Sequence, residues 1–115
     1  MEENCIFCKI AAGAMPVDLL YEDDAVVAFN DIKPQAPVHV LVIPREHIPT
    51  VNEINQLNAG LAGRLVSAAG KIAKDLGVDK SGYRIVLNCN KDAGQEVFHV
   101  HAHLLGGRKF AWPPG

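Results

Sequence analysis

The pattern of apolar and polar positions along the chain predicts five strands and two helices. The expected strands cover residues 18–22, 25–30, 38–43, 83–90 and 97–105. Asp23 and Asp24 suit a hairpin turn between the first two runs. The third run is β-branched and lies between prolines, which is typical of a central strand buried on both faces. The last two runs are separated by a turn that contains Gly94.

Apolar residues at spacings of three and four between Val51 and Leu76 predict one long amphipathic helix. Thr50 or Asn52 can cap its start, and Gly77 can end it in the left-handed conformation. Three glycines within it, at positions 60, 63 and 70, would let the helix lie close against a sheet. Residues 5–12 predict a second, short helix. Together with hairpin-length connections, these elements predict an antiparallel α+β fold in a single domain, residues 1–115.

Composition narrows the class of protein. The chain has 115 residues and a net charge of −2, and its Lys and Arg do not cluster, so there is no electrostatic footprint for nucleic acid. The sequence shows no signal peptide and no apolar stretch long enough to cross a membrane, so we expect a cytoplasmic protein. In that compartment its three cysteines are thiols or metal ligands rather than disulfides.

Three histidines stand at alternate positions of the last expected strand. Because side chains alternate in a strand, His99, His101 and His103 would project from one face, about 6.6–6.8 Å apart. The residues of the opposite face, which can pack under the helix, are Phe98, Val100, Ala102 and Leu104. A face that carries three imidazoles is poorly suited to a core, because each buried ring nitrogen needs a partner. The row therefore indicates a functional site.

Two chemistries use such a row. Imidazoles can bind Zn²⁺, or a neutral imidazole can attack phosphorus while a second one holds or delivers a proton. His39, at the start of the buried strand, is a fourth candidate, as a relay that orients the nucleophilic histidine or as a structural residue bonded to backbone.

Several motifs together resemble one known family. HVHAHLL at residues 99–105 resembles the His-x-His-x-His-x-x signature of the histidine triad superfamily. NDIKPQAPVH at residues 30–39 and GQEVF at residues 94–98 are similar to that family's segments before its first histidine and beside the phosphate. GGR at residues 106–108 and WPPG at residues 112–115 resemble the nucleotide-binding branch often called Hint.

The resemblance implies a fold, an assembly and an activity. Members of the family pair through a five-stranded antiparallel sheet into a homodimer with a continuous sheet. They bind purine nucleoside monophosphates, and the Hint branch hydrolyses nucleoside phosphoramidates and related aminoacyl-adenylates with no metal required for the chemistry. We therefore expect a purine nucleotide and a second copy of the chain as partners, and neither nucleic acid nor membrane.

The resemblance also implies roles for individual residues. His101 matches the nucleophile, His103 the residue that contacts the phosphate and assists departure of the amine, and His39 the residue that supports His101 through its other ring nitrogen. Asp31 matches the residue that accepts the ribose hydroxyls. The other residues that the resemblance places in the nucleotide site are Phe7, Ile10, Phe29 and Leu41 around the base, Asn88, Gly94, Gln95, Glu96 and Val97 at the phosphate, and Trp112, which would reach the site of the other subunit.

Glu96 departs from the family pattern, which has a small hydroxyl residue there in animal members. A carboxylate at this position would repel the phosphate or favour a cationic amine as the leaving group.

The competing functions are a non-catalytic nucleotide-binding scaffold, a zinc hydrolase that uses the histidine row as ligands, and a dinucleoside polyphosphate hydrolase of the same superfamily.

Cys5 and Cys8 form a Cys-x-x-Cys pair that suits a metal better than redox chemistry, because no strand precedes it. Some bacterial members of the family add two histidines to such a pair, and His47 and His99 match those positions. This set of four ligands predicts a structural Zn²⁺. In that case only His101 and His103 of the row would face the phosphate.

Overall fold

The computed structural model describes residues 2–115 of the chain. Its helical elements are α1 (Ile6–Ala11), the 3-10 turn η1 (Val51–Glu53), α2 (Ala59–Asp75) and α3 (Asn90–Ala93). Its strands are β1 (Leu19–Glu22), β2 (Val26–Asn30), β3 (Val38–Pro44), β4 (Tyr83–Leu87) and β5 (Ala102–Gly106). Within these residues, no helix is long and apolar enough to cross a membrane.

The five strands form one antiparallel sheet in the order β1-β2-β3-β5-β4, which confirms the expected α+β class. β3 lies at the centre of the sheet, and its residues from His39 to Pro44 are all buried, as its sequence predicted. The hairpin between β1 and β2 forms at Asp23, where one carboxylate oxygen accepts the N–H groups of Ala25 and Val26. Asx turns of this kind close a hairpin without a glycine.

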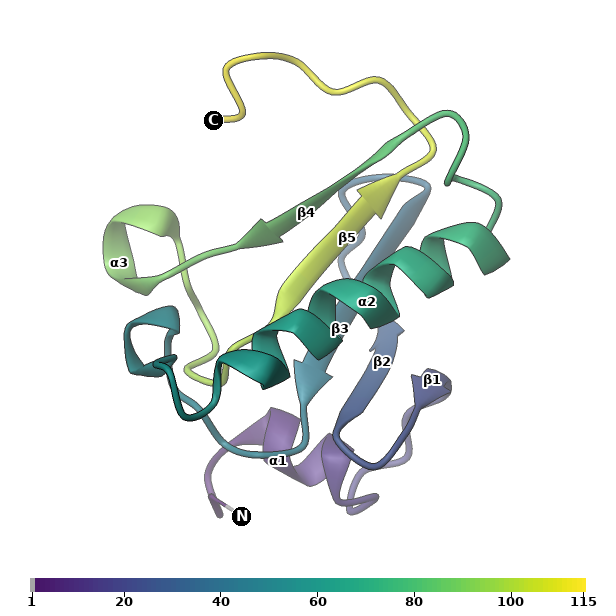
Figure 1. Cartoon of the computed structure of the whole chain (residues 1–115). Helices are drawn as coiled ribbons and strands as arrows, with labels where there is room; N and C mark the ends of the chain where they lie inside the picture. Colours follow the sequence, from purple (N-terminus) through teal and green to yellow (C-terminus); the bar gives the residue numbers. More distant parts are fainter. Residues whose placement is uncertain (1) are drawn as a thin grey trace.

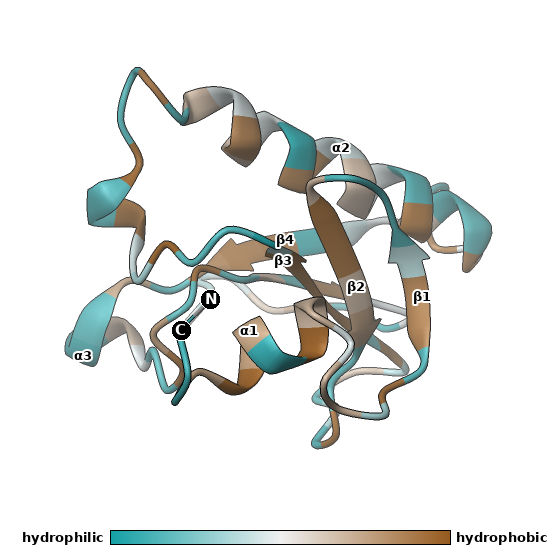
Figure 2. Cartoon of the chain, turned by 90° about the horizontal axis from the view of Figure 1, so that it is seen from below, coloured by the Kyte–Doolittle hydropathy of each residue, from teal (hydrophilic) through white to brown (hydrophobic). Residues whose placement is uncertain are grey.

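The two faces of the sheet carry separate apolar cores because side chains alternate along each strand. Helix α2 runs across one face (Figure 1). The core beneath it combines buried α2 residues from Leu65 to Ala73 with alternate residues of β2, β3 and β5, such as Val40 and Leu104. Helix α1 covers the opposite face (Figure 2) and packs on Phe29 and Leu41. The functional side chains lie on this α1 side.

The long helix expected from Val51 to Leu76 is interrupted, and this part of the prediction was wrong. Thr50 and Glu53 form a capping box around η1. The side chains of Asn55 and Asn58 then hydrogen-bond to nearby main chain, and α2 starts only at Ala59. Asn side chains compete in this way with the helical hydrogen bonds of the backbone.

The glycines of this segment behave in two ways. Gly77 adopts the expected left-handed conformation, with φ of +76°. The close-packing role expected for the helix glycines does not hold for Gly60 and Gly63, because a Cβ at either position would meet no atom within 4 Å. At Gly70 a Cβ would make an ordinary contact, 3.6 Å from the Tyr83 hydroxyl.

The last strand is also shorter than its alternation predicted. β5 covers only Ala102–Gly106, so His99 and His101 lie in the irregular segment before it, which bends at residues 97–99. Val100, Ala102 and Leu104 pack under α2 as expected, but Phe98 is 49% exposed and lies outside that core. The strand at residues 83–90 likewise ends at Leu87, and the turn after it contains helix α3, which ends at Gly94.

Candidate active site and metal cluster

His101 is buried on the α1 side of the sheet, with its ring held from two directions. Its Nδ1 lies 2.8 Å from the carbonyl oxygen of His99. Its ring also makes an edge-to-face contact with Phe7, at 5.1 Å between ring centroids. A carbonyl oxygen only accepts hydrogen bonds, so Nδ1 must carry the ring proton. Neutral His101 therefore has its lone pair on Nε2, which is the form a nucleophile needs.

His39 and His103 form a pair beside this ring. The register of β3 against β5 sets Leu41 opposite His103 and His39 opposite Leu105, so the two histidines are diagonal neighbours on one face. His39 Nε2 lies 2.9 Å from His103 Nδ1. We expected His39 to support His101, and this was wrong. His39 Nε2 bonds to His103, and His101 Nδ1 bonds to the His99 carbonyl oxygen instead. The His101 and His103 rings remain close, at 5.0 Å between centroids.

Hydrogen-bond donors and acceptors fix the tautomers of this pair. The main-chain N–H of Gln35 donates to His39 Nδ1 at 3.0 Å, so that nitrogen is an acceptor and the proton of neutral His39 lies on Nε2. Nε2–H then donates to His103 Nδ1, which leaves the proton of neutral His103 on its own Nε2. His103 thus offers an N–H donor next to the lone pair of His101.

Burial keeps this pair neutral. The pKa of His103 is lowered to about 4, first by burial and then by the neighbouring His101 and His39, while Asp31 opposes the shift. Burial also lowers the pKa of His39, against the attraction of Asp31, whose carboxylate lies 3.4 Å from His39 Nε2. At pH 7 both rings are therefore the neutral tautomers described above.

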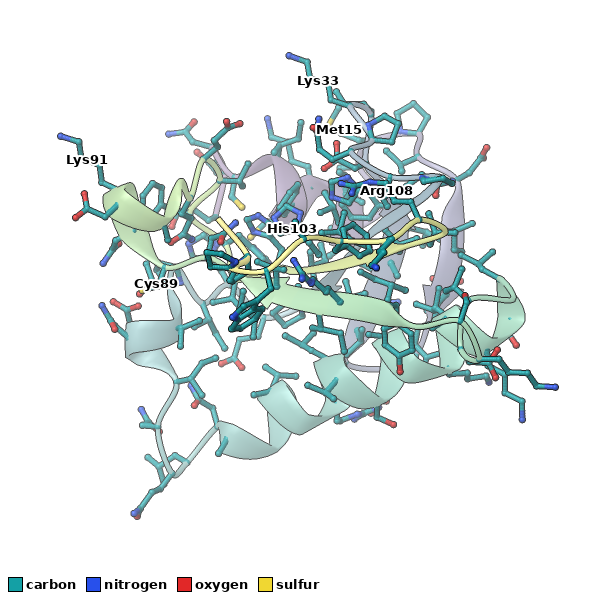
Figure 3. The ribbon with its side chains drawn as sticks, turned by 90° about the horizontal axis from the view of Figure 1, so that it is seen from above. Met15, Lys33, Cys89, Lys91, His103 and Arg108 are labelled. Carbon is teal, nitrogen blue, oxygen red and sulfur yellow. The ribbon has the colours of Figure 1, made fainter. Side chains whose placement is uncertain are left out.

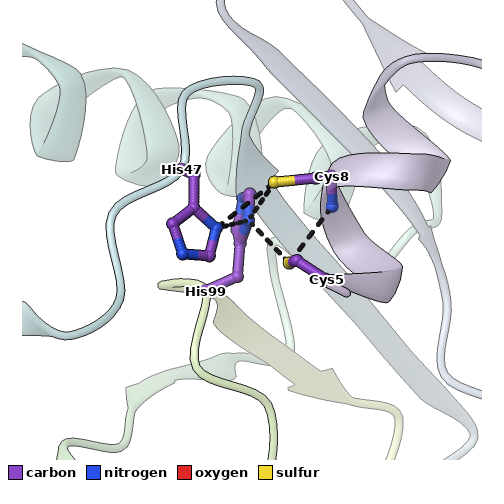
Figure 4. Close-up of side chains that lie close together, drawn as sticks. All are labelled: Cys5, Cys8, His47 and His99. Carbon is purple, nitrogen blue, oxygen red and sulfur yellow. Dashed lines mark hydrogen bonds between the residues drawn. The ribbon is translucent and has the colours of Figure 1, made fainter. Parts of the chain in front are cut away.

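Cys5, Cys8, His47 and His99 converge at the N-terminus of α1 (Figure 4). Their ligand atoms lie within 4.8 Å of one another. His99 Nδ1 is 3.3 Å from Cys5 Sγ and 3.5 Å from Cys8 Sγ. His47 Nδ1 is 3.2 Å from Cys8 Sγ and 3.3 Å from His99 Nδ1. A tetrahedral Zn²⁺ with ordinary bond lengths requires N–N edges of about 3.3 Å and N–S edges of about 3.6 Å, so this donor set fits the ion.

The orientation of His99 also fits a metal. Its Nε2 donates to the carbonyl oxygen of Pro44 at 2.8 Å, so Nδ1 faces the two sulfurs with its lone pair. Burial lowers the pKa of His99, which keeps the ring in the neutral form that a ligand needs. Burial raises the pKa of the Cys5 thiol, so its thiolate would form here with a cation beside it. The four expected ligands are therefore brought together in one buried cluster.

Asp31, His39 and His103 also gather three potential ligand atoms within 4.8 Å of one another. Their tautomers oppose metal binding, because a ligating histidine donates its second N–H to an acceptor. His39 instead accepts the Gln35 N–H at that nitrogen, which places the proton on Nε2, where a metal would have to bind. This trio suits proton positioning rather than coordination.

The four residues expected around the base lie in one cluster under α1. Phe7, Ile10, Phe29 and Leu41 are between 5% and 7% exposed and contact the same core. Phe7 stacks edge-on against Phe29 as well as against His99 and His101, with ring centroids 5.6, 5.9 and 5.1 Å apart. Asp31 is half-buried beside His39, with Oδ1 accepting the Lys33 N–H. The apolar cluster and the carboxylate therefore flank the histidines on the α1 side.

The loop expected at the phosphate is ordered by its own hydrogen bonds. The N–H groups of Gly94 and Gln95 donate to the carbonyls of Lys91 and Asn90, so neither is free for an anion as the sequence suggested. The buried Gln95 side chain donates to Pro49 and Val97 and accepts from Asn90, which ties this loop to the segment before η1. The remaining residues expected there are Asn88, half-buried after β4, Glu96, exposed, and Val97, half-buried.

Trp112 lies in the C-terminal tail, where its side chain is 82% exposed. The tail is held through Phe110, whose ring lies under the guanidinium groups of Arg84 and Arg108 at 5.3 and 4.3 Å. Sequence reasoning missed Arg108 and the main-chain groups of Gln35 and Pro44, because a backbone partner leaves no side-chain signature.

Comparisons with known proteins find relatives that match most of the chain. The HIT domain family matches residues 12–110 of the chain. The chain is 49% identical over 108 residues to the purine nucleoside phosphoramidase of Escherichia coli K12, covering 94% of this chain and 91% of that protein. It superimposes with a TM-score of 0.95 on the crystal structure of a HIT family hydrolase from Legionella pneumophila, at 49% identity, covering 97% of this chain and 100% of that one. A HIT family hydrolase from Clostridium thermocellum gives a TM-score of 0.94 at 51% identity, covering 96% of both chains.

Proposed function

We propose, given that the chain belongs to the HIT domain family, that it hydrolyses the phosphorus–nitrogen bond of purine nucleoside 5′-phosphoramidates. The observation that carries this proposal is the hydrogen bond from His101 Nδ1 to the His99 carbonyl oxygen. In the neutral tautomer this bond leaves the lone pair on Nε2 of a buried imidazole, close to the His103 ring, and that lone pair is what nucleophilic attack at phosphorus requires. The curated relative named for this activity supports the same reaction.

The proposed reaction has two steps. His101 Nε2 attacks the phosphorus, a bond forms between that nitrogen and phosphorus, and the bond to the substrate amine breaks with its electron pair leaving on the amine. The amine takes up a proton and departs. Water then attacks the nucleotidyl-histidine, which releases nucleoside monophosphate and restores His101. Two displacements at one phosphorus divide a difficult hydrolysis into two easier ones.

His103 and His39 act on the phosphate side of this reaction. The Nε2–H of His103 donates to a phosphoryl oxygen or to the departing nitrogen, and His39 holds that tautomer through the 2.9 Å hydrogen bond to His103 Nδ1. Asp31 accepts the ribose hydroxyls, and the apolar cluster around Phe7 contacts the purine. The phosphate N–H donors come from the main chain after Gln95, since those of Gly94 and Gln95 are already paired.

Cys5, Cys8, His47 and His99 would hold a structural Zn²⁺, which when bound supplies charge neutralisation for two thiolates and a rigid link between α1 and the histidine segment. Two of this chain's own groups transmit that rigidity to the site. The His99 carbonyl bonds to His101, and Phe7, on the same helix as Cys8, contacts the rings of both His99 and His101.

The assembly and location remain part of this proposal. A homodimer with a continuous sheet is supported by β4, which is at one end of the strand order, and by the half-exposed Leu87 on it. Sedimentation analysis would return twice the mass of the 12.4 kDa chain, and a monomer would contradict the dimer. The cytoplasmic location and the single-domain organisation of residues 1–115 are kept as expected from the sequence.

The competing functions are less well supported. A non-catalytic scaffold does not require the tautomer that exposes His101 Nε2. A zinc hydrolase using the histidine row is opposed by the proton on His39 Nε2 and by the separation of His99 into the cysteine cluster. Among superfamily hydrolases, a relative named purine nucleoside phosphoramidase favours cleavage of a phosphoramidate over a dinucleoside polyphosphate.

Hydrolysis of adenosine 5′-phosphoramidate by wild type and His101→Ala tests the proposal. We expect turnover to fall by about 10³-fold or more in the variant, because it removes the attacking nitrogen. AMP binding, measured by calorimetry, should survive, since the pocket around Phe29 and Leu41 is unchanged. Substantial turnover by His101→Ala would contradict the covalent mechanism. Rapid denaturation at alkaline pH, at which a phosphorus–nitrogen bond to histidine survives, would trap the nucleotide on the wild-type protein and gives an independent readout.

A further inference from the structure

A chain of hydrogen bonds connects the segment after β5 to the catalytic pair. The guanidinium of Arg108 donates to the Gln35 carbonyl oxygen from Nε at 3.2 Å and from Nη2 at 3.1 Å. The N–H of the same Gln35 donates to His39 Nδ1 at 3.0 Å, and His39 Nε2 is 2.9 Å from His103 Nδ1. Figure 3 shows Arg108 just beyond the end of the strand that carries His103.

The local sequence places Arg108 for this contact. Gly107 has φ of +88°, and a Cβ on it would lie 2.8 Å from Cβ of Pro37, so only glycine lets β5 leave the sheet this close to the loop before β3. Phe110 then supports the guanidinium at 4.3 Å, and the Lys109 carbonyl accepts from Nη1 at 3.1 Å. Three contacts therefore hold the guanidinium in one orientation.

The loop that Arg108 contacts has few other ties. Residues 32–35 are exposed, and Ile32 is 93% exposed. The contacts within the loop run from Lys33 N–H to Asp31 and from the Gln35 side chain to the Lys33 carbonyl, so neither attaches Gln35 to the sheet. The two hydrogen bonds from the Arg108 guanidinium to the Gln35 carbonyl oxygen connect this loop to the segment after β5. An N–H on an unattached loop would donate to His39 only part of the time.

We propose that Arg108 is a positioning residue, whose hold on Gln35 keeps the proton of His39 on Nε2 and thereby the proton of His103 on the nitrogen that faces the substrate. The inference rests on the proposed function for its catalytic meaning. Its structural part concerns the tautomers alone. When the Gln35 N–H is lost, His39 can carry its proton on Nδ1 and accept from His103 Nδ1–H, which removes the Nε2–H donor of His103.

Arg84→Ala is the matched control for Arg108→Ala. Both arginines lie over Phe110, and both donate to main-chain carbonyls of the tail segment, but Arg84 donates to Ala111 and makes no hydrogen bond to Gln35. Loss of Arg84 therefore perturbs the tail in the same way without breaking the connection to His39. Arg108→Lys keeps one donor for the Gln35 carbonyl and should partly restore what Arg108→Ala loses.

The test combines two readouts on the full chain. Two-bond ¹H–¹⁵N correlation spectra report which ring nitrogen of each histidine carries the proton, and steady-state hydrolysis of adenosine 5′-phosphoramidate gives kcat and KM. We expect Nε2–H tautomers for His39 and His103 in wild type and in Arg84→Ala. In Arg108→Ala the His39 resonances should shift toward the Nδ1–H form, with kcat reduced roughly tenfold and KM nearly unchanged.

Several results would overturn the proposal. One is an Nδ1–H tautomer of His39 in wild type, and another is an unchanged spectrum and kcat in Arg108→Ala. A third is an equal loss of kcat in Arg84→Ala, which would assign the effect to the tail as a whole. Failure of Arg108→Lys to recover any activity or tautomer would also contradict it. If wild type does not hydrolyse the phosphoramidate, the proposed function fails, and the ring resonances alone decide whether Arg108 sets the tautomer.

Discussion

The neutral state of His103 makes a quantitative prediction about stability against pH. Burial lowers the pKa of its folded form to about 4, against an ordinary value of 6.5 in the unfolded chain. As the pH falls below 6.5 the unfolded chain gains a proton at His103 and the folded protein does not, so the free energy of unfolding decreases toward pH 4. The contribution of this one histidine is fully present above pH 6.5.

The size of the loss follows from the two pKa values. At pH 5, protonation of His103 shifts the folding equilibrium toward the unfolded state by a factor of about thirty, which lowers the free energy of unfolding by about 2 kcal/mol. Raising the folded pKa by one unit changes this figure by only about 0.4 kcal/mol, so pH 5 is a robust point for the comparison.

Equilibrium urea unfolding at pH 7 and pH 5 measures this loss in wild type and in His103→Gln. The variant keeps the other four histidines, so the difference between the two proteins reports chiefly on His103. Wild type should lose about 2 kcal/mol more than the variant between the two pH values. An equal loss in both proteins would show that His103 is not held neutral by burial, and would remove the argument for its Nε2–H donor.

Three further predictions concern the metal, the turn after β5 and the loop tie. Cys8→Ser should bind no zinc, as measured by mass spectrometry, and should have a lower Tm than wild type. Cys89→Ser, which lies outside the cluster, should keep its zinc and the wild-type Tm. Equal zinc contents in the two variants would refute the site. Gly107→Ala should lower the free energy of unfolding by about 1–3 kcal/mol, because it combines a left-handed φ with a 2.8 Å contact to Pro37, and an unchanged urea midpoint would contradict this. Gln95→Ala should cost about 1–3 kcal/mol by unpairing partly buried main-chain groups, and faster hydrogen exchange at Asn90 would localise the effect.

Most of the sheet and the side on which each functional residue lies could be predicted from the order of the residues. Alternation and β-branched runs placed the strands, since a residue's face in a strand depends only on its parity, and the buried run at residues 38–43 could lie only at the centre of the sheet. The same parity put His101 and His103 on one side of the sheet, with Val100 and Leu104 under α2. The family motifs identified the four residues of the cysteine–histidine cluster before their positions were known.

The separate roles of the histidines, in contrast, depend on contacts that form when the chain folds. His99 turns toward the cysteines while its carbonyl holds His101, and His39 pairs with His103 rather than with His101. These choices depend on strand register and on main-chain donors and acceptors, which carry no residue-specific signal. The break before α2 has the same origin. The apolar periodicity predicted a continuous helix, but the Asn55 and Asn58 side chains hydrogen-bond to main-chain groups that a helix would have paired. Periodicity reports which side chains are buried, and it does not report where each backbone hydrogen bond goes.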